Sequence, residues 1–261
     1  RIDEKPDIII GSSVHPLTCV AAIKISRHYK IRNIVEIRDL WPESLVAYGL
    51  LTSYSLIARL LYWLERWIYA SADNIVFTME GGRDYIVDKK WDSSNGGPVE
   101  LDKVHYINNG VDLEVFHSNL EQNRITDPDL DNPSTFKVVY SGSIRKVNDL
   151  SKLVYAAGVV QEKIENNIMF LIYGDGDQRE ELQRLAIQEG IKNIRFKGKV
   201  EKKNIPYILS KCDLAYNEEG QFDLFEYGSS SNKLFEYLAA GLPILRISSH
   251  KYSIEGRYNC S

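Results

Sequence analysis

The chain has few of the residues that define disulfide-rich or membrane-spanning proteins. Only three of its 261 residues are cysteine, and Cys19, Cys212 and Cys260 lie far apart. Their odd number and wide spacing argue against a disulfide framework or a metal site, so we expect reduced thiols. No apolar run approaches the roughly 20 residues that a membrane span needs, and no signal peptide is recognisable at the start. These features predict a cytoplasmic protein.

The chain also has no excess of positive charge: it contains 32 Lys and Arg residues and 36 Asp and Glu residues. This balance gives no reason to expect nucleic acid as a partner. The length fits two α/β domains of about 100–150 residues each, or one large domain. The charged start leads directly into an apolar run at 7–10, and no final helix is recognisable at the end. We therefore expect a fragment that is truncated at both ends.

Short apolar runs alternate with longer helical patterns along the whole chain. We predict strands at 7–11, 33–37, 74–78, 104–108, 136–141, 168–173, 193–198, 214–216 and 243–247. We predict helices at 18–29, 53–70, 82–89, 149–165, 178–189, 205–211 and 232–240. Strand followed by helix, repeated in this way, predicts an α/β protein with parallel sheets and helices on both faces.

A polar stretch divides the chain near its middle. Residues 118–134 contain Pro128 and Pro133, have Asp or Asn at 127, 129, 131 and 132, and show no apolar period. We interpret 118–134 as a linker between an N-terminal domain at 1–117 and a C-terminal domain at 135–261. Ligands of doubly wound sheets bind outside the carboxyl ends of the strands, so we expect the site in a cleft that the two domains face.

Two glycine-containing turns follow predicted strands of the second domain. Gly174-Asp175-Gly176 precedes a strongly helical segment, and Gly142-Ser143 is followed by Arg145 and Lys146. Glycines at such turns let backbone amides approach a ligand, and a helix N-terminus favours an anion. Cations beside them suit a diphosphate. Both patterns also fit ordinary tight turns with exposed charges.

The segment 228–243 carries the densest set of polar residues. Small polar residues lead into a predicted helix with Lys233 and, three residues later, Glu236 on the same face. A carboxylate there can accept two hydrogen bonds from a ribose diol while the lysine and the first amides face phosphate. The alternative is a surface ion pair between these two side chains.

In the first half, Arg38, Asp39 and Glu43 lie just after a predicted strand. They are candidates for contact with an acceptor or donor, and equally for a buried ion pair that positions Trp41.

The helical segment 53–72 is rich in Leu, Ile, Tyr and Trp, with Arg59 and Arg66 between them. Packing inside the first domain explains this pattern, and so does a helix that lies in a membrane interface.

Several ordered motifs resemble a known family. YSGSIRK, LIYGDGD, NIRFKGKV and NKLFEYLAAGLP resemble the C-terminal domain of the retaining glycosyltransferases of family 4. Upstream, GSSVHPLT, EIRDLWPESL, YASADNIVFT and INNGVDLEVF resemble part of their N-terminal domain. The similarity is greatest to bacterial capsule and O-antigen transferases of the N-acetylfucosamine type. It implies the GT-B fold, with two Rossmann-like domains, both incomplete here.

The resemblance also implies which residues bind the donor. Glu236 matches the second glutamate of the E-x7-E motif, which binds the ribose, whereas Gly228 occupies the place of the first. The Arg and Lys that hold the diphosphate in the family are replaced here by Ser143 and Asn148. We therefore assign the diphosphate contact to Arg145, Lys146 or Lys233. Because the first glutamate is missing, we assign sugar contacts to Ser229, Ser230 or Asn232 instead. The donor-binding set is Gly142, Ser143, Lys146, Gly174, Asp175, Gly176, Ser230, Ser231, Asn232 and Glu236.

For the reaction itself, the resemblance assigns His15 to catalysis, and we add Arg145 and Lys233 because a departing diphosphate needs positive charge. We place Arg38, Asp39 and Glu43 on the acceptor side. Relatives transfer the sugar by same-face attack, without a side-chain nucleophile. Asp175 and Asp177 have a metal-binding spacing but lie in the glycine-rich turn of a metal-independent fold, so we expect no metal and no cofactor.

The expected substrates are a UDP-sugar donor and a polyprenyl-linked sugar acceptor at the inner face of the membrane. Two other functions fit the same residues: a UDP-sugar 2-epimerase, which shares the fold, and a non-catalytic nucleotide-sugar-binding subunit. A dinucleotide-dependent oxidoreductase fits less well, because the Gly174–Gly176 turn lacks the third glycine of the dinucleotide fingerprint.

Overall fold

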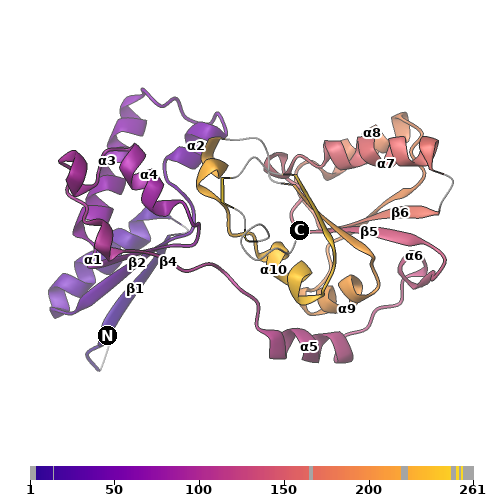
Figure 1. Ribbon diagram of the computed structural model, residues 1–261, viewed down its shortest axis with the longest axis horizontal. Coiled ribbons are helices and arrows are strands. Elements are labelled where there is room, and N and C mark those ends of the chain that lie inside the picture. Colours follow the sequence, from indigo (N-terminus) through magenta and orange to yellow (C-terminus); the bar gives the residue numbers. More distant parts are fainter. Residues whose placement is uncertain are drawn as a thin grey trace. The chain divides into compact units, whose positions relative to one another are not determined.

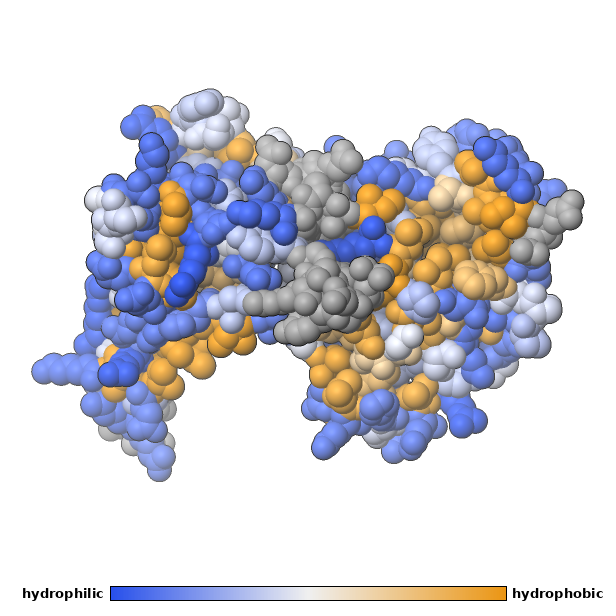
Figure 2. Space-filling model, viewed as in Figure 1, coloured by the Kyte–Doolittle hydropathy of each residue, from blue (hydrophilic) through white to orange (hydrophobic). Residues whose placement is uncertain are grey.

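Figure 1 shows a computed structural model of the chain, which describes residues 4–13, 15–164, 167–218, 223–247, 251–252 and 254. The chain forms two compact units. The first unit contains residues 1–109 with 222–230 and 249–260, and the second contains residues 110–221 with 231–248. Each unit has its own parallel sheet covered by helices, and in Figure 2 apolar residues reach the surface of both units among polar ones.

The first unit is built on a four-stranded parallel sheet in the order β1-β2-β3-β4. Its strands are β1 (Ile8–Ser13), β2 (Arg32–Ile37), β3 (Asn74–Phe77) and β4 (Val104–Tyr106). Its helices are α1 (Pro16–Tyr29), α2 (Glu43–Ala47), α3 (Leu56–Ser71) and α4 (Gly82–Asp88), with short 3-10 helices at Ser93–Asn95, Leu101–Lys103 and Asp223–Tyr227. Apolar residues such as Val35, Ile75 and Phe77 form its core against α1, α3 and α4.

The second unit has a five-stranded parallel sheet in the order β7-β6-β5-β8-β9. Its strands are β5 (Phe136–Ser141), β6 (Ile168–Tyr173), β7 (Ile194–Gly198), β8 (Leu214–Glu218) and β9 (Ile244–Ile247). Its helices are α5 (Leu113–Gln122), α6 (Pro128–Asp131), α7 (Ser151–Lys163), α8 (Arg179–Gln188), α9 (Ile205–Ser210) and α10 (Asn232–Ala239), with 3-10 turns at Lys146–Asn148 and Lys202–Asn204.

Separate apolar cores lie on the two faces of this sheet. One combines β5 and β6 with α7 and α8, and the other combines β5 and β8 with α5, α9 and α10. In Figure 1, α7 and α8 lie on one side of the sheet, and α9 and α10 lie on the other. The chain proceeds from β5 to β7 in one direction and then continues at β8 on the opposite side of β5. Such a reversal marks the usual ligand site of a doubly wound sheet.

The predicted α/β class with two parallel sheets is confirmed. All nine predicted strands and all seven predicted helices are present, with bounds that differ by three residues or fewer. The predicted end of the helix 149–165 lies outside the described residues, and α7 itself ends at Lys163.

The predicted linker at 118–134 differs from the structure. The C-terminal half of α5 and the whole of α6 lie in it, and Leu130 is buried in the second unit together with Phe116. Asp112 caps α5 and Asp127 caps α6, each accepting backbone amide hydrogen bonds. The division between the units falls instead after residue 109. Each of the two helices buries a single side chain, Phe116 in α5 and Leu130 in α6, so neither shows an apolar period that a sequence pattern could reveal.

Both cysteines in the described part of the chain are buried free thiols. Burial raises the pKa of Cys19 to about 11 and that of Cys212 to about 12, so both stay protonated at neutral pH. Cys260 lies outside the described residues.

A carboxyl group lies in the core of the first unit. The Glu65 side chain, on α3, accepts hydrogen bonds from the hydroxyls of Tyr69 at 2.7 Å and Tyr85 at 2.8 Å. Burial raises the pKa of Glu65 to about 8. The folded unit therefore holds a proton on Glu65 at neutral pH, whereas the unfolded chain does not.

We expect the first unit to become less stable as the pH rises, because its folded state holds a proton on Glu65 that the unfolded chain releases. The raised pKa contributes stability that is complete below about 4.5, the ordinary pKa, and is lost as the pH rises through about 8. Between these limits the loss is about 1.4 kcal/mol per pH unit. The Glu65→Gln variant should lack this slope.

The measurement is urea unfolding from pH 5 to pH 8, followed by tryptophan fluorescence. All four tryptophans, Trp41, Trp63, Trp67 and Trp91, lie in the first unit, so the signal reports that unit alone. Equal slopes for the wild type and Glu65→Gln would contradict a protonated Glu65.

Candidate functional site

The two glycine-containing turns of the second unit lie against each other at the carboxyl ends of β5 and β6. The Gly174 φ angle is +142°, and an added Cβ would lie 1.7 Å from the Gly142 carbonyl oxygen. At Gly176, a Cβ would lie 2.2 Å from the Ile144 carbonyl oxygen. The Ile144 amide donates to the Asp175 carbonyl at 2.9 Å and locks the turns together. Only glycine permits this approach at position 174.

This packing changes the predicted role of the glycine amides. The Gly142 amide donates to the Tyr173 carbonyl at 3.0 Å, and the Gly174 amide donates to the Gly198 carbonyl at 2.8 Å. Both amides are therefore engaged in holding neighbouring turns together. The glycines shape the site by close backbone packing, whereas we predicted that they would present amides to a ligand.

A cavity of about 750 Å³ opens at these strand ends. It is bounded by the turns after β5, β6 and β7 and by the start of α10. It brings together seven predicted site residues: Gly142, Ser143, Gly174, Asp175, Asn232, Lys233 and Glu236. We call it the donor cavity. Because the N-terminus of α10 meets it, the positive end of that helix dipole favours an anion there.

Lys233 lies in the first turn of α10, beside Tyr140 of β5. Its Nζ lies 4.7 Å from the centre of the Tyr140 ring and donates to the Tyr140 hydroxyl at 3.3 Å. The Tyr140 hydroxyl in turn donates to the Ser143 carbonyl at 2.7 Å. A cation is thereby held in the donor cavity next to the glycine turn.

Glu236 lies one turn further along α10. Its side chain is only 15% exposed, and its Oε1 lies 3.7 Å from Lys202 Nζ. Burial raises the pKa of Glu236 above its ordinary value, and the Lys202 ammonium opposes this shift. A half-buried carboxylate beside a cavity is suited to accept hydrogen bonds from the hydroxyls of a ligand.

The sequence analysis did not predict the part of the donor cavity that follows β7. Lys199, Val200, Glu201 and Lys202 follow β7 and line the donor cavity together with Ile205. Lys199 and Val200 belong to the motif NIRFKGKV, from which no site residue was predicted. The rule that ligands bind at carboxyl ends of strands applies to β7 as well, and it would have identified them.

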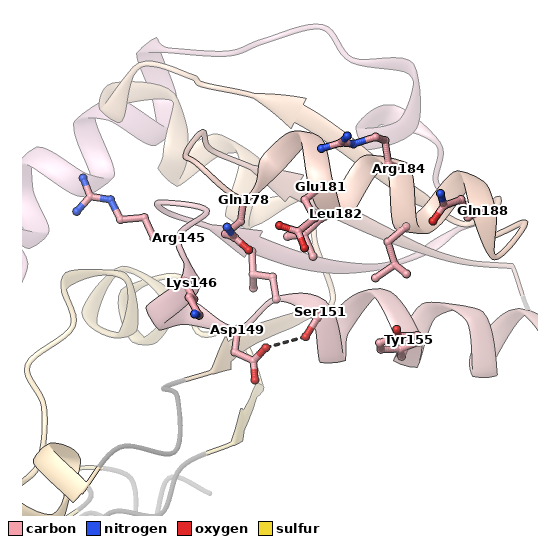
Figure 3. Close-up of a pocket in the computed structure, with 12 residues that line it drawn as sticks. Arg145, Lys146, Asp149, Ser151, Tyr155, Gln178, Glu181, Leu182, Arg184 and Gln188 are labelled. Carbon is pink, nitrogen blue, oxygen red and sulfur yellow. Dashed lines mark hydrogen bonds between the residues drawn. The ribbon is translucent and has the colours of Figure 1, made fainter. Parts of the chain in front are cut away.

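Arg145 and Lys146 do not line the donor cavity. They border a different cavity of about 660 Å³, formed by α7, α8 and the turn before α7 (Figure 3). In Figure 3 the Arg145 side chain points away from the residues of α7 and α8. The fully buried Ile144 anchors the turn after Ser143, and the chain then runs toward α7. These two cations and Lys233 therefore line different cavities.

The other small polar residues before α10 are placed as follows. Ser231 is the N-cap residue of α10, and its side chain makes no capping hydrogen bond. Ser230 belongs to the first unit, where its hydroxyl accepts from the Asn109 amide at 3.0 Å and its carbonyl accepts from Asn109 Nδ2 at 2.8 Å. Gly228, at the place of the missing glutamate, has a φ angle of +89°, which favours glycine.

In the first unit, three predicted residues lie at neighbouring strand ends. His15 follows β1 and caps α1, its Nδ1 accepting from the Leu17 amide at 3.3 Å. Arg38 and Asp39 follow β2, are exposed, and lie beside β1 because Ser13 and Ile37 are in register. Their exposure does not agree with the alternative of a buried ion pair.

Glu43 has a different environment from its neighbours. Its carboxylate lies 2.5 Å from Lys89 Nζ and accepts from the Tyr62 hydroxyl at 2.8 Å. This network ties α2 to α3 and α4, which is a structural role.

Asp175, which was predicted to bind the sugar donor and has a metal-binding spacing to Asp177, makes its interactions within its own turn. Its Oδ1 accepts from the Gly176 amide at 2.9 Å and lies 3.6 Å from Arg179 Nη1. Within the described ranges, no three His, Cys, Asp or Glu side chains cluster as metal ligands would.

The fold and the donor cavity define a class of protein. Two α/β units, each with a parallel sheet, match the GT-B architecture of solved glycosyltransferases, which confirms the predicted fold. HepE of Anabaena, solved in complex with UDP and glucose, superimposes with a TM-score of 0.61 at 16% identity; the match covers 91% of this chain and 58% of that one.

Sequence comparison identifies the family. Residues 122–252, half of the chain, match the family described as Glycosyl transferases group 1, and the chain belongs to this family. The glycosyltransferase WbjE of Pseudomonas aeruginosa is 27% identical over 243 residues, which are 92% of this chain and 57% of WbjE. The colanic acid biosynthesis glycosyl transferase WcaI of Escherichia coli (strain K12) is 24% identical over 250 residues, 91% of this chain and 56% of WcaI. The chain thus spans little more than half the length of these relatives.

Proposed function

We propose that the protein transfers a sugar, with retention, from a UDP-sugar to a lipid-linked saccharide at the cytoplasmic face of a membrane. The observation that carries this proposal is the donor cavity, where Glu236 and Lys233 lie on one helix beside two interlocked glycine turns. In this arrangement Glu236 accepts from the ribose hydroxyls, while Lys233 and the start of α10 face the diphosphate. The resemblance to family 4 and the UDP bound to HepE support the choice of donor.

The chemistry requires no nucleophilic side chain. The acceptor hydroxyl oxygen forms a bond to the anomeric carbon on the face from which UDP departs, and the bond from that carbon to the β-phosphate oxygen breaks. The hydroxyl proton passes to the departing phosphate oxygen. Positive charge from Lys233 stabilises the developing diphosphate, which removes the need for a metal ion or cofactor.

The sugar and the acceptor are further parts of the proposal. A glycine at position 228 leaves no carboxylate at that place for the sugar hydroxyls, so Ser231 and Asn232 are the polar groups we assign to an N-acetylated amino sugar. Exposed His15, Arg38 and Asp39 are assigned to the acceptor side. The description of WcaI as a colanic acid biosynthesis glycosyl transferase agrees with a polysaccharide intermediate as acceptor.

Donor binding by the Glu236→Ala variant tests the proposal. Calorimetry with a panel of UDP-, GDP- and TDP-sugars, on the full-length protein, should find one class of UDP-sugar that binds. Because a hydrogen bond to a charged group contributes about 1.5–3 kcal/mol, the variant should bind about 10–100-fold more weakly. Glu189→Ala, which removes an exposed carboxylate at the end of α8, is the matched control and should bind normally.

The same protein then separates the alternatives. Transfer to a lipid-linked acceptor, unchanged by EDTA, is the expected result. Formation of a 2-epimer without transfer would identify an epimerase, and tight binding without any turnover would identify a non-catalytic subunit. If no nucleotide sugar binds, the assignment of the donor cavity is wrong.

A further inference from the structure

Helix α3 of the first unit is apolar on the side that faces away from its own core. Its buried side consists of Ala58, Glu65, Ile68 and Tyr69. On the opposite side, Leu56 is 80% exposed, Leu60 62% and Trp63 59%, and Ile57 is exposed beside them. A helix on the surface of a protein ordinarily turns polar residues outward, so four large apolar residues on this side require a reason.

These exposed residues form one continuous stripe. Leu56, Leu60 and Trp63 are spaced by four and then three residues, which places them one above another along a single helix face. The loop that leads into α3 adds Tyr54, which is 90% exposed. We define the α3 surface as Leu56, Ile57, Leu60 and Trp63 together with the exposed Arg59 and Arg66.

The charges on the α3 surface have one sign. Between residues 50 and 71 the charged residues are Arg59, Glu65 and Arg66, and Glu65 is buried in the core. Both exposed charges are therefore positive. Arg59 and Arg66 are seven residues apart, so they lie along one border of the apolar stripe.

We propose that the α3 surface binds the interface of a membrane that contains anionic lipids. Leucine and isoleucine side chains enter the boundary between head groups and acyl chains, Trp63 is suited to the head-group level, and both arginines reach anionic head groups. A second copy of the chain is a poorer partner, because antiparallel pairing of two α3 helices would bring Arg59 of one copy near Arg66 of the other. All residues of the α3 surface lie in the first unit. The inference rests on the proposed function only in that a lipid-linked acceptor gives the protein a reason to bind a membrane.

Vesicle flotation tests the inference. The full-length protein should float with vesicles of phosphatidylcholine and phosphatidylglycerol at 3:1, more weakly with pure phosphatidylcholine, and less with anionic vesicles as salt increases. Arg59→Gln with Arg66→Gln should weaken partitioning to anionic vesicles about 30-fold, at about 1 kcal/mol per arginine. Leu60→Ser should weaken partitioning to both kinds of vesicle about tenfold or more.

Ile187→Ser is the matched control. Ile187 is 79% exposed on α8 of the second unit, so the substitution removes a similar exposed side chain from a different place. It should leave flotation unchanged. Circular dichroism melting should be unaltered in both serine variants, since neither side chain is buried.

Three results would overturn the inference. The first is equal flotation of Leu60→Ser and Ile187→Ser, and the second is no flotation of the wild type with anionic vesicles. The third is a dimer in sedimentation equilibrium that Leu60→Ser abolishes, which would show that a second copy covers the α3 surface. UDP-sugar binding, measured on the same samples, separates this outcome from failure of the proposed function, because the donor cavity lies wholly in the second unit.

Discussion

Replacing Gly174 with alanine is expected to destabilise the second unit by about 3–5 kcal/mol and to abolish donor binding. The reason is backbone contact, because the new Cβ would lie 1.7 Å from the Gly142 carbonyl oxygen. At a φ angle of +142°, an L-residue is also strained before any contact is considered. The turns after β5 and β6 would have to separate, and the hydrogen bond from the Ile144 amide to the Asp175 carbonyl would break.

Gly190→Ala is the control for this substitution. Gly190 follows α8 with a φ angle of +64°, and an added Cβ would meet nothing within 4 Å. Its cost should be only about 1 kcal/mol, from backbone conformation alone. Hydrogen exchange of the β5 and β6 amides, followed by mass spectrometry, measures the stability of this unit separately. Equal protection in the two variants would contradict the interlocked turns.

The regular elements could be predicted because their sequence patterns reflect burial. Strands such as Phe136–Ser141 and Ile168–Tyr173 are short apolar runs because both faces of a parallel sheet are covered by helices. Strand and helix alternate along the chain, which allows few topologies other than two parallel sheets.

Helices α2, α5 and α6 could not be predicted in the same way. They have 5, 10 and 4 residues, and each contributes few buried side chains to a core that other elements provide. Asp127 and Pro128, which suggested a linker, are the N-cap and first residue of α6. Caps and turns use the same residue types, and tertiary contact decides between them.

The candidate site was predictable to the extent that it follows strand ends. Glycine at 142 and 174 and the polar start of α10 were recognisable, because strand-to-helix turns have characteristic residues. The direction of Arg145 and Lys146 was not, since it depends on how Ile144 is anchored in the core. The pairing of Glu236 with Lys202 joins residues 34 positions apart and leaves no local pattern.

Replacing Lys233 with methionine is expected to lower kcat about 10²–10³-fold, with a much smaller effect on KM. Methionine keeps a similar unbranched side chain beside Tyr140 but removes the positive charge from the donor cavity. Charge on the diphosphate increases as the glycosidic bond breaks, so the ammonium stabilises the transition state more than the bound donor. Steady-state transfer assays with the preferred UDP-sugar measure both constants.

Lys146→Met is the matched control, because it removes the same charge from the cavity between α7 and α8. Its kcat should stay within about twofold of the wild type, since Lys146 lines the cavity between α7 and α8 and is not among the residues that line the donor cavity. The comparison decides between two assignments of the diphosphate cation. A large loss of kcat for Lys146→Met with little loss for Lys233→Met would place that cation after the glycine turn, as the sequence motif predicts. The opposite result would place it on α10, where the geometry of the second unit favours it.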